Sequence, residues 1–259
     1  MLFFFVAYPT LPEPLPYIFN KNSIFMSTNA NTGHTDRRKF LGSLATGAAA
    51  LGISTVAAPL QTFAENNRIA GGVEDADAWF NKVKGKHRVV FDATHPNGVF
   101  PFAWPRVFLA TNAATGSTEK DCGVVVVLRH DAIPYAMDTK LWEKYNFGEV
   151  FHVPDPANAS EKAKKNPFWQ PAPGTYKFPG IGEVQIGINE LQANGVMFCV
   201  CNAALTVYSA AVAGGMGLKA EDVKKEWEAG LFPGIQIVPS GVWALGRAQE
   251  KGCAYIFAG

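Results

Sequence analysis

An uninterrupted apolar run, Gly123-Val124-Val125-Val126-Val127-Leu128, constrains the fold of this chain more than any other stretch. β-branched residues favour strands, and a strand without polar alternation is one that is buried on both faces. Strands of this kind belong to parallel sheets whose two faces are covered by helices. The run therefore predicts an α/β protein with a parallel sheet.

Four further short apolar runs are expected to be strands, at 88–92, 196–201, 235–238 and 253–257. Helical spacing of apolar residues separates them and predicts helices at 75–84, 106–115, 139–145, 186–194, from 202 onward, at 219–229 and at 240–250. Strands that alternate with helices form right-handed crossover units around a parallel sheet. We therefore expect a sheet of five parallel strands.

The stretch from Gly195 to Leu205 reads as a strand, a tight turn and the start of a helix, with Asn202 as the expected N-cap. Cys201 then lies at the carboxyl end of a buried strand and beside a helix N-terminus. Open α/β sheets bind ligands at this edge, and the N-terminus of a helix favours a thiolate. Cys201 is thus a candidate reactive thiol. A packing role is the alternative, because free cysteines are among the most buried residues.

The first 64 residues are expected to be an extension and a signal peptide rather than part of the fold. Asp36-Arg37-Arg38-Lys39-Phe40-Leu41 is a twin-arginine core, followed by a weakly apolar run and a small-residue cleavage site that ends at Ala64. This predicts a periplasmic protein, exported in folded form by the twin-arginine translocase. The sequence leaves open whether translation starts at Met1 or at Met26. Residues 65–85 are expected to be a linker with a short helix, and 86–259 the domain.

Composition excludes several classes of protein. The chain has 259 residues, four cysteines and a formal net charge of +1, which gives no indication of a nucleic-acid partner or of a membrane surface. Four cysteines in a chain of this length do not form a disulfide framework. The sequence contains no glycine-rich phosphate loop and no zinc-type cysteine spacing, so no cofactor is predicted.

The segment 151–182 interrupts the strand and helix pattern with prolines and turn residues, and it is rich in aromatic residues such as Phe168, Trp169, Tyr176 and Phe178. A connection of this length within a domain is usually a lid, a binding loop or an oligomer contact. A disordered surface excursion is the alternative, although disordered segments usually lack aromatic residues.

Two sets of motifs resemble a known family. Leu191-Gln192-Ala193-Asn194-Gly195-Val196, continued by Cys201-Asn202-Ala203-Ala204-Leu205, is similar to the central signature of the DsrE/DsrF-like family. Ile237-Val238-Pro239-Ser240-Gly241-Val242 and the segment 249–256 resemble its C-terminal signature. The resemblance covers 86–259, with 151–182 as an insertion. It implies a flavodoxin-like three-layer α/β/α sandwich, assembly as trimers or hexamers, and a sulfur relay in which Cys201 falls on the persulfide-carrying position.

A flavodoxin-like strand order would put the first strand beside both the second and the third, and would bring several polar residues to one edge of the sheet. The first hypothesis is sulfane-sulfur binding or transfer by a sulfurtransferase-like carrier, with Cys201 as the nucleophile. His130 and Arg129 would stabilise the anion, and a sulfur compound or protein would act as donor or acceptor. The expected binding residues are Asp92, His95, Asp131 and Asn202, with Phe102 and Trp104 as the pocket wall.

Two alternatives remain open. His95, His130, Asp131 and Cys201 are ligand types that zinc or copper accepts, which makes a mixed metal site the second hypothesis. The third hypothesis is a non-catalytic oligomeric module that binds a small molecule or a protein through its aromatic insertion.

Overall fold

The computed structural model describes residues 72–156 and 158–259. The predicted extension and signal peptide at 1–64 lie outside the described residues. Among the helices of the described part, none is long and apolar enough to cross a membrane.

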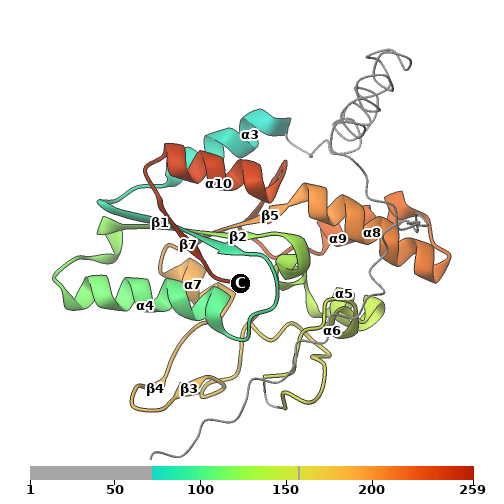
Figure 1. Ribbon diagram of the computed structural model, residues 1–259, viewed down its shortest axis with the longest axis horizontal. Helices are drawn as coiled ribbons and strands as arrows, with labels where there is room; N and C mark the ends of the chain where they lie inside the picture. The colour runs from blue at the N-terminus through green and yellow to red at the C-terminus, as the bar shows by residue number, and fades with distance from the viewer. Residues whose placement is uncertain (1–71, 157) are drawn as a thin grey trace, which may run out of the picture. The chain divides into compact units, whose positions relative to one another are not determined.

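The described residues contain a sheet of five parallel strands, in the order β6-β5-β2-β1-β7 (Figure 1). These strands are β1 (His87–Ala93), β2 (Cys122–Leu128), β5 (Met197–Cys201), β6 (Ile235–Val238) and β7 (Ala254–Phe257). The predicted strands are confirmed to within one residue at each end. The valine run does form a buried strand, because β2 lies in the middle of the sheet between β1 and β5.

The order of the strands differs from the expected one. β1 pairs with β2 and β7, and β2 separates it from β5, so the expectation that the first strand would lie beside the third is wrong. The chain adds β2, β5 and β6 in one direction, and its last crossover returns to the opposite edge. All five strands are parallel, so their carboxyl ends still share one edge of the sheet.

Helices cover both faces of the sheet and complete a three-layer α/β/α sandwich. One face packs against α4 (Phe100–Ala114), α8 (Asn202–Met216) and α9 (Ala220–Ala229). The other face packs against α3 (Gly72–Trp79), a 3₁₀ turn at Phe80–Lys82, and α10 (Gly241–Glu250). Figure 1 shows α3 and α10 above the sheet and α4 below it.

α4 begins six residues earlier than expected. Pro105 was interpreted as the residue before the helix, whereas α4 starts at Phe100 and contains Pro105 in its second turn. Pro101, the second residue of the helix, costs little because the first N–H groups of a helix have no partner within it. Pro105 lies beyond these positions and removes the hydrogen bond that its N–H would give to the carbonyl of Pro101. The aromatic segment 100–104 is therefore the first turn of a helix and not a loop.

The segment between β2 and β5 is ordered over its described residues. After the 3₁₀ segment η3 (His130–Ala136) come α5 (Thr139–Tyr145), α6 (Phe147–Val150), the hairpin β3 (Lys177–Phe178) with β4 (Gly182–Glu183), and α7 (Ile188–Ala193). Asn166 is buried; its amide donates to the carbonyls of Tyr135 and Met137 at 2.9 Å and accepts from the Phe168 N–H at 3.0 Å. A disordered excursion is thus excluded for the described part of 151–182.

Candidate functional site

Cys201 lies where β5 ends and α8 begins, as predicted, but it takes the role that was expected of Asn202. Cys201 is the N-cap of α8, and its Sγ accepts a hydrogen bond from the Ala204 N–H at 3.3 Å. Asn202 is the first residue of the helix and is fully buried. The thiol therefore occupies the place where the free N–H groups of a helix favour negative charge.

A pocket of about 430 Å³ lies over Cys201. It is bordered by the first turns of α8 and α10 and by the residues that follow β2, among them Arg129, His130, Tyr208, Ser240 and Gly241. Ser240 caps α10 by accepting a hydrogen bond from the Trp243 N–H at 3.2 Å. Two helix N-termini therefore meet at this pocket together with a guanidinium group, and all three favour an anion.

Arg129 is held by Asp92, the last polar residue of β1. Its Nε lies 2.6 Å from Asp92 Oδ1 and its Nη2 lies 2.9 Å from Oδ2, and Asp92 is only 1% exposed. The Tyr255 hydroxyl donates to the same carboxylate at 2.8 Å. The pKa of Arg129 is raised, mainly by its hydrogen bond to Asp92, and the charges of Asp92, Tyr255 and Cys201 act in the same direction. Asp92 thus positions the guanidinium beside the thiol.

Gly241 supports the same arrangement from the other side. A Cβ atom at this position would lie 2.5 Å from the Cβ of Arg129. Real Cβ atoms do not approach so closely, so only a glycine lets Arg129 lie across the first turn of α10. The guanidinium is therefore fixed between a buried carboxylate and a helix N-terminus.

His130 forms the rim of the pocket. Its Nδ1 lies 3.2 Å from Asp131 Oδ1, its side chain is 62% exposed, and its backbone φ of 52° is in the left-handed region. The Tyr208 hydroxyl donates to Asp131, and burial, followed by this hydrogen bond, raises the pKa of Tyr208. Asp131 thus orients His130 and Tyr208 and does not itself line the pocket.

None of the six expected binding residues lines this pocket. Asp92 and Asp131 hold residues that do, Asn202 is buried as the first residue of α8, and the other three lie elsewhere. His95 Nδ1 forms a hydrogen bond with the Thr94 hydroxyl at 2.7 Å, and the His95 ring lies near that of Phe257. Phe102 is fully buried against other rings, and Trp104 is 40% exposed and stacks on Phe100. The expectation that Phe102 and Trp104 wall the Cys201 pocket is wrong, because α4 begins at Phe100 and turns Phe102 toward the sheet.

The metal hypothesis receives no support from the arrangement. Within residues 72–156 and 158–259, no three His, Cys, Asp or Glu side chains are close enough to hold a metal ion. His95, His130, Asp131 and Cys201 therefore do not form a ligand set, since His95 lies apart from the pocket.

The cysteines differ from one another in their surroundings, and all four are free thiols. Residues two apart in a regular strand share one face, but Cys199 and Cys201 do not. Cys199 packs in the core beneath α3 and α10, whereas Cys201 packs with the opposite core because it turns to cap α8. Burial raises the pKa of Cys199. Cys201 is therefore the thiol that reaches a pocket at this edge.

No local pattern in the sequence selected Tyr208, Ser240 or Tyr255 as site residues. Tyr208 fits the apolar spacing of its helix, and Ser240 stands at the start of the helix expected at 240–250. The Tyr255 hydroxyl reaches Asp92 because β7 pairs with β1, which depends on the strand order. A glycine that follows a predicted N-cap at a strand end is the one local signal that pointed to Gly241.

Fold and site together define an α/β sandwich with a single thiol at an anion-favouring edge of a parallel sheet. A scan against models of protein families found no match, and a search of the curated proteins found none. Among solved structures, the chain is similar to a protein of unknown function, MTH1491 from Methanobacterium thermoautotrophicum. The identity is 16%, the match covers 66% of this chain and 98% of that chain, and the TM-score is 0.32. A likeness of this degree carries no argument about function.

Proposed function

We propose that the protein carries sulfane sulfur as a persulfide on Cys201, in the manner of the DsrE/DsrF-like family that its motifs resemble. The observation that carries the proposal is the position of the Cys201 sulfur. It accepts the Ala204 N–H at the start of α8 and opens on a pocket that Arg129 also lines. A persulfide anion on Cys201 would find positive potential from the guanidinium and from two helix N-termini.

The chemistry is an exchange at sulfur. The Cys201 thiolate attacks the outer sulfur of a persulfide or polysulfide donor, and a new S–S bond forms as the donor's own S–S bond breaks. The shortened donor leaves with the electron pair as a thiolate or sulfide and takes up a proton. Transfer to an acceptor thiolate is the same step in reverse, so neither direction needs an external oxidant.

The surrounding residues have distinct roles in this proposal. Arg129 stabilises the anionic sulfur, and Asp92 and Gly241 hold Arg129 in position. His130 lies at the rim, where its largely exposed imidazole can give a proton to the leaving thiolate. Asn202 lies buried behind the thiol as the first residue of α8.

The wider setting belongs to the same proposal. The twin-arginine core at Arg37-Arg38 supports export of the folded domain to the periplasm, and the family resemblance supports a homo-oligomer, a trimer or hexamer, that exchanges sulfur with a donor or acceptor. Replacing both arginines by lysine should keep the protein in the cytoplasmic fraction. An unchanged periplasmic fraction would contradict this part of the proposal. Sedimentation of the exported protein measures its oligomeric state. A monomer at all concentrations would exclude the proposed trimer or hexamer.

The test of the central step is mass spectrometry of the intact protein after treatment with inorganic polysulfide. We expect a mass increase of one or more sulfur atoms that dithiothreitol removes and that Cys201→Ala abolishes. Cys122→Ala is the matched control, because Cys122 is a partly exposed thiol at the opposite end of β2. An increase that survives in Cys201→Ala would remove the proposal.

A further inference from the structure

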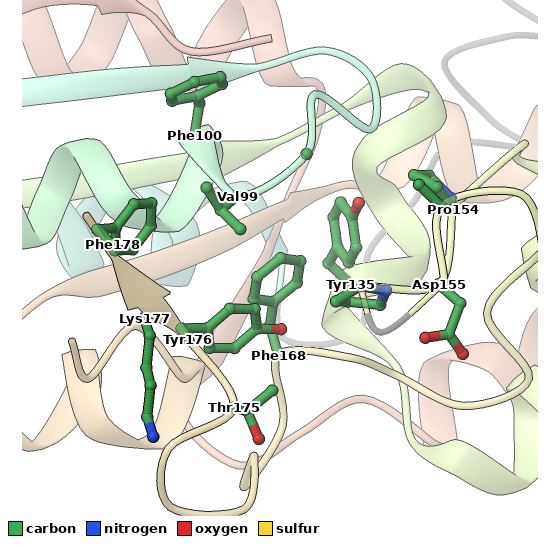
Figure 2. Close-up of a pocket in the computed structure, with 13 residues that line it drawn as sticks. Val99, Phe100, Tyr135, Pro154, Asp155, Phe168, Thr175, Tyr176, Lys177 and Phe178 are labelled. Carbon is green, nitrogen blue, oxygen red and sulfur yellow. The ribbon is translucent and has the colours of Figure 1, made fainter. Parts of the chain in front are cut away.

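A second cavity, of about 400 Å³, opens between the turn before α4 and the insertion (Figure 2). It shares no residue with the Cys201 pocket. Its apolar lining comes from three distant parts of the chain, and includes Val99, Phe100, Tyr135, Phe168, Tyr176 and Phe178. We propose that this cavity, here called the aromatic pocket, binds a small, flat, uncharged molecule with an aromatic ring and one hydroxyl or carbonyl group.

The walls of the aromatic pocket are built before any ligand arrives. Phe168 stacks parallel to Tyr176, with ring centroids 5.3 Å apart, and meets Tyr135 edge to face at the same distance. Phe102 packs against Phe168 from the core side, with centroids 4.1 Å apart. Asn166 donates one hydrogen bond to Tyr135 in η3 and one to Met137 just after it, and it accepts a third from Phe168 within the insertion. Aromatic faces fixed in this way bind flat apolar molecules with little loss of side-chain freedom.

The Tyr135 hydroxyl is the feature that points to a ligand. Tyr135 is 1% exposed and lines the aromatic pocket, and none of the hydrogen bonds found among the described residues involves its hydroxyl. The neighbouring Tyr176 hydroxyl, by contrast, donates to the Pro167 carbonyl at 2.7 Å. A hydroxyl group at the wall of a cavity takes its hydrogen-bond partner from whatever fills the cavity, water or a ligand. Figure 2 shows the Tyr135 ring between Val99 and Pro154, where a bound molecule would supply that partner.

The chemistry of the lining sets the class of molecule. Burial raises the pKa of Tyr135 above its ordinary value, so the hydroxyl stays protonated and serves as a donor. The charged side chains at the rim, Asp155 and Lys177, have opposite signs, and in Figure 2 Lys177 extends away from the ring cluster. The pocket therefore selects neither an anion nor a cation. Its volume is at the lower end of the range for ligand sites, about 300 to 1,000 Å³, which favours one ring or two.

Phenol and toluene are matched probes for this inference, because they share a ring and differ in the hydrogen-bonding group. We expect saturable binding of phenol to the purified full chain, followed by NMR or calorimetry. Toluene should bind about three- to tenfold more weakly, the range of one net hydrogen bond. Tyr135→Phe should lower the phenol affinity to that of toluene and leave toluene unchanged. The control Tyr145→Phe should keep the preference, since the Tyr145 hydroxyl bonds Glu226 outside the pocket.

A second variant tests the location without touching Tyr135. Thr175 is exposed at the rim of the aromatic pocket, so Thr175→Trp should fill the opening and abolish binding of both probes while the protein stays folded. The inference is overturned if phenol shows no saturable binding, if both probes bind equally, or if phenol binding survives Thr175→Trp. The polysulfide reaction of Cys201 is a separate readout, so failure of either proposal is recognised independently.

Discussion

The Cys201 pocket and the aromatic pocket lie at opposite ends of η3, and they are built in opposite ways. The Cys201 pocket uses groups that the sheet itself positions, namely strand ends, helix N-termini and a buried ion pair. The aromatic pocket uses side chains from the insertion, from η3 and from the turn before α4, none of which belongs to the five-stranded sheet. His130 begins η3 at the first pocket, and Tyr135 lies near its end at the second. The groups that form the Cys201 pocket therefore also stabilise the fold, whereas the aromatic pocket is formed by segments outside the five-stranded sheet.

Removal of Arg129 should have the largest effect on stability. Arg129→Ala leaves the Asp92 carboxylate buried without its cation, and we expect a loss of about 3 kcal/mol in the free energy of unfolding, measured with urea at pH 7. Arg247→Ala is the control, because Arg247 pairs with Asp77 near the surface and should cost less than about 1 kcal/mol. Equal losses of unfolding free energy in the two variants would mean that the Asp92–Arg129 pair at the Cys201 pocket does not stabilise the fold.

Gly148→Ala should damage the insertion and spare the Cys201 pocket. A Cβ atom at Gly148 would overlap the backbone carbonyl of Ala163, and we expect a loss of about 2 kcal/mol with weaker phenol binding. The polysulfide mass increase on Cys201 should persist. Gly246→Ala is the matched control, since open space surrounds that position in α10, and it should be neutral or stabilise by about 0.5 kcal/mol. Parallel loss of both activities would contradict the separation of the two pockets.

Gly241→Ala should alter the Cys201 pocket and spare the aromatic pocket. The added methyl group displaces Arg129 from the first turn of α10 and weakens the positive potential at Cys201. We expect alkylation of Cys201 by iodoacetamide at pH 7 to slow by a factor of about three, as for the loss of a helix-terminal charge interaction. Phenol binding should not change. Alkylation of Cys122 in the same sample provides the internal reference, and an unchanged ratio would exclude a role for Arg129 at the thiol.

Tyr135→Phe should have the smallest effect on stability at neutral pH, close to zero, because the hydroxyl has no partner in the described part of the chain. The effect should change with pH. The pKa of Tyr135 is raised in the folded state, so above about pH 10 this side chain ionises only in the unfolded chain. The wild type therefore keeps its full stability relative to Tyr135→Phe below about pH 10 and loses stability relative to the variant as the pH rises further. Urea denaturation at pH 7 and pH 10.5 checks this. A large loss at pH 7 would show that the hydroxyl has a structural partner.

The sequence predicted the sheet because apolar runs such as Val124–Leu128 signal burial directly. It also predicted Cys201, Arg129 and His130 as neighbours, because the carboxyl ends of parallel strands share an edge whatever their order. Tyr255 could not be found in this way, since its contact with Asp92 depends on the order β2-β1-β7.

The aromatic pocket could not be predicted from local patterns. Phe168 and Tyr176 were visible as aromatic residues in an insertion, but their partner Tyr135 lies in η3, which has neither helical nor strand periodicity. Phe102 was assigned to the wrong pocket, because the helix was expected to begin at Arg106, after Pro105. Both errors arise where packing between distant segments overrides local sequence signals.

The four free thiols have a consequence for the stability of the chain. Cys122, Cys199, Cys201 and Cys253 form no covalent cross-link, and the core closes through packing alone. No disulfide therefore contributes to the stability of the described residues.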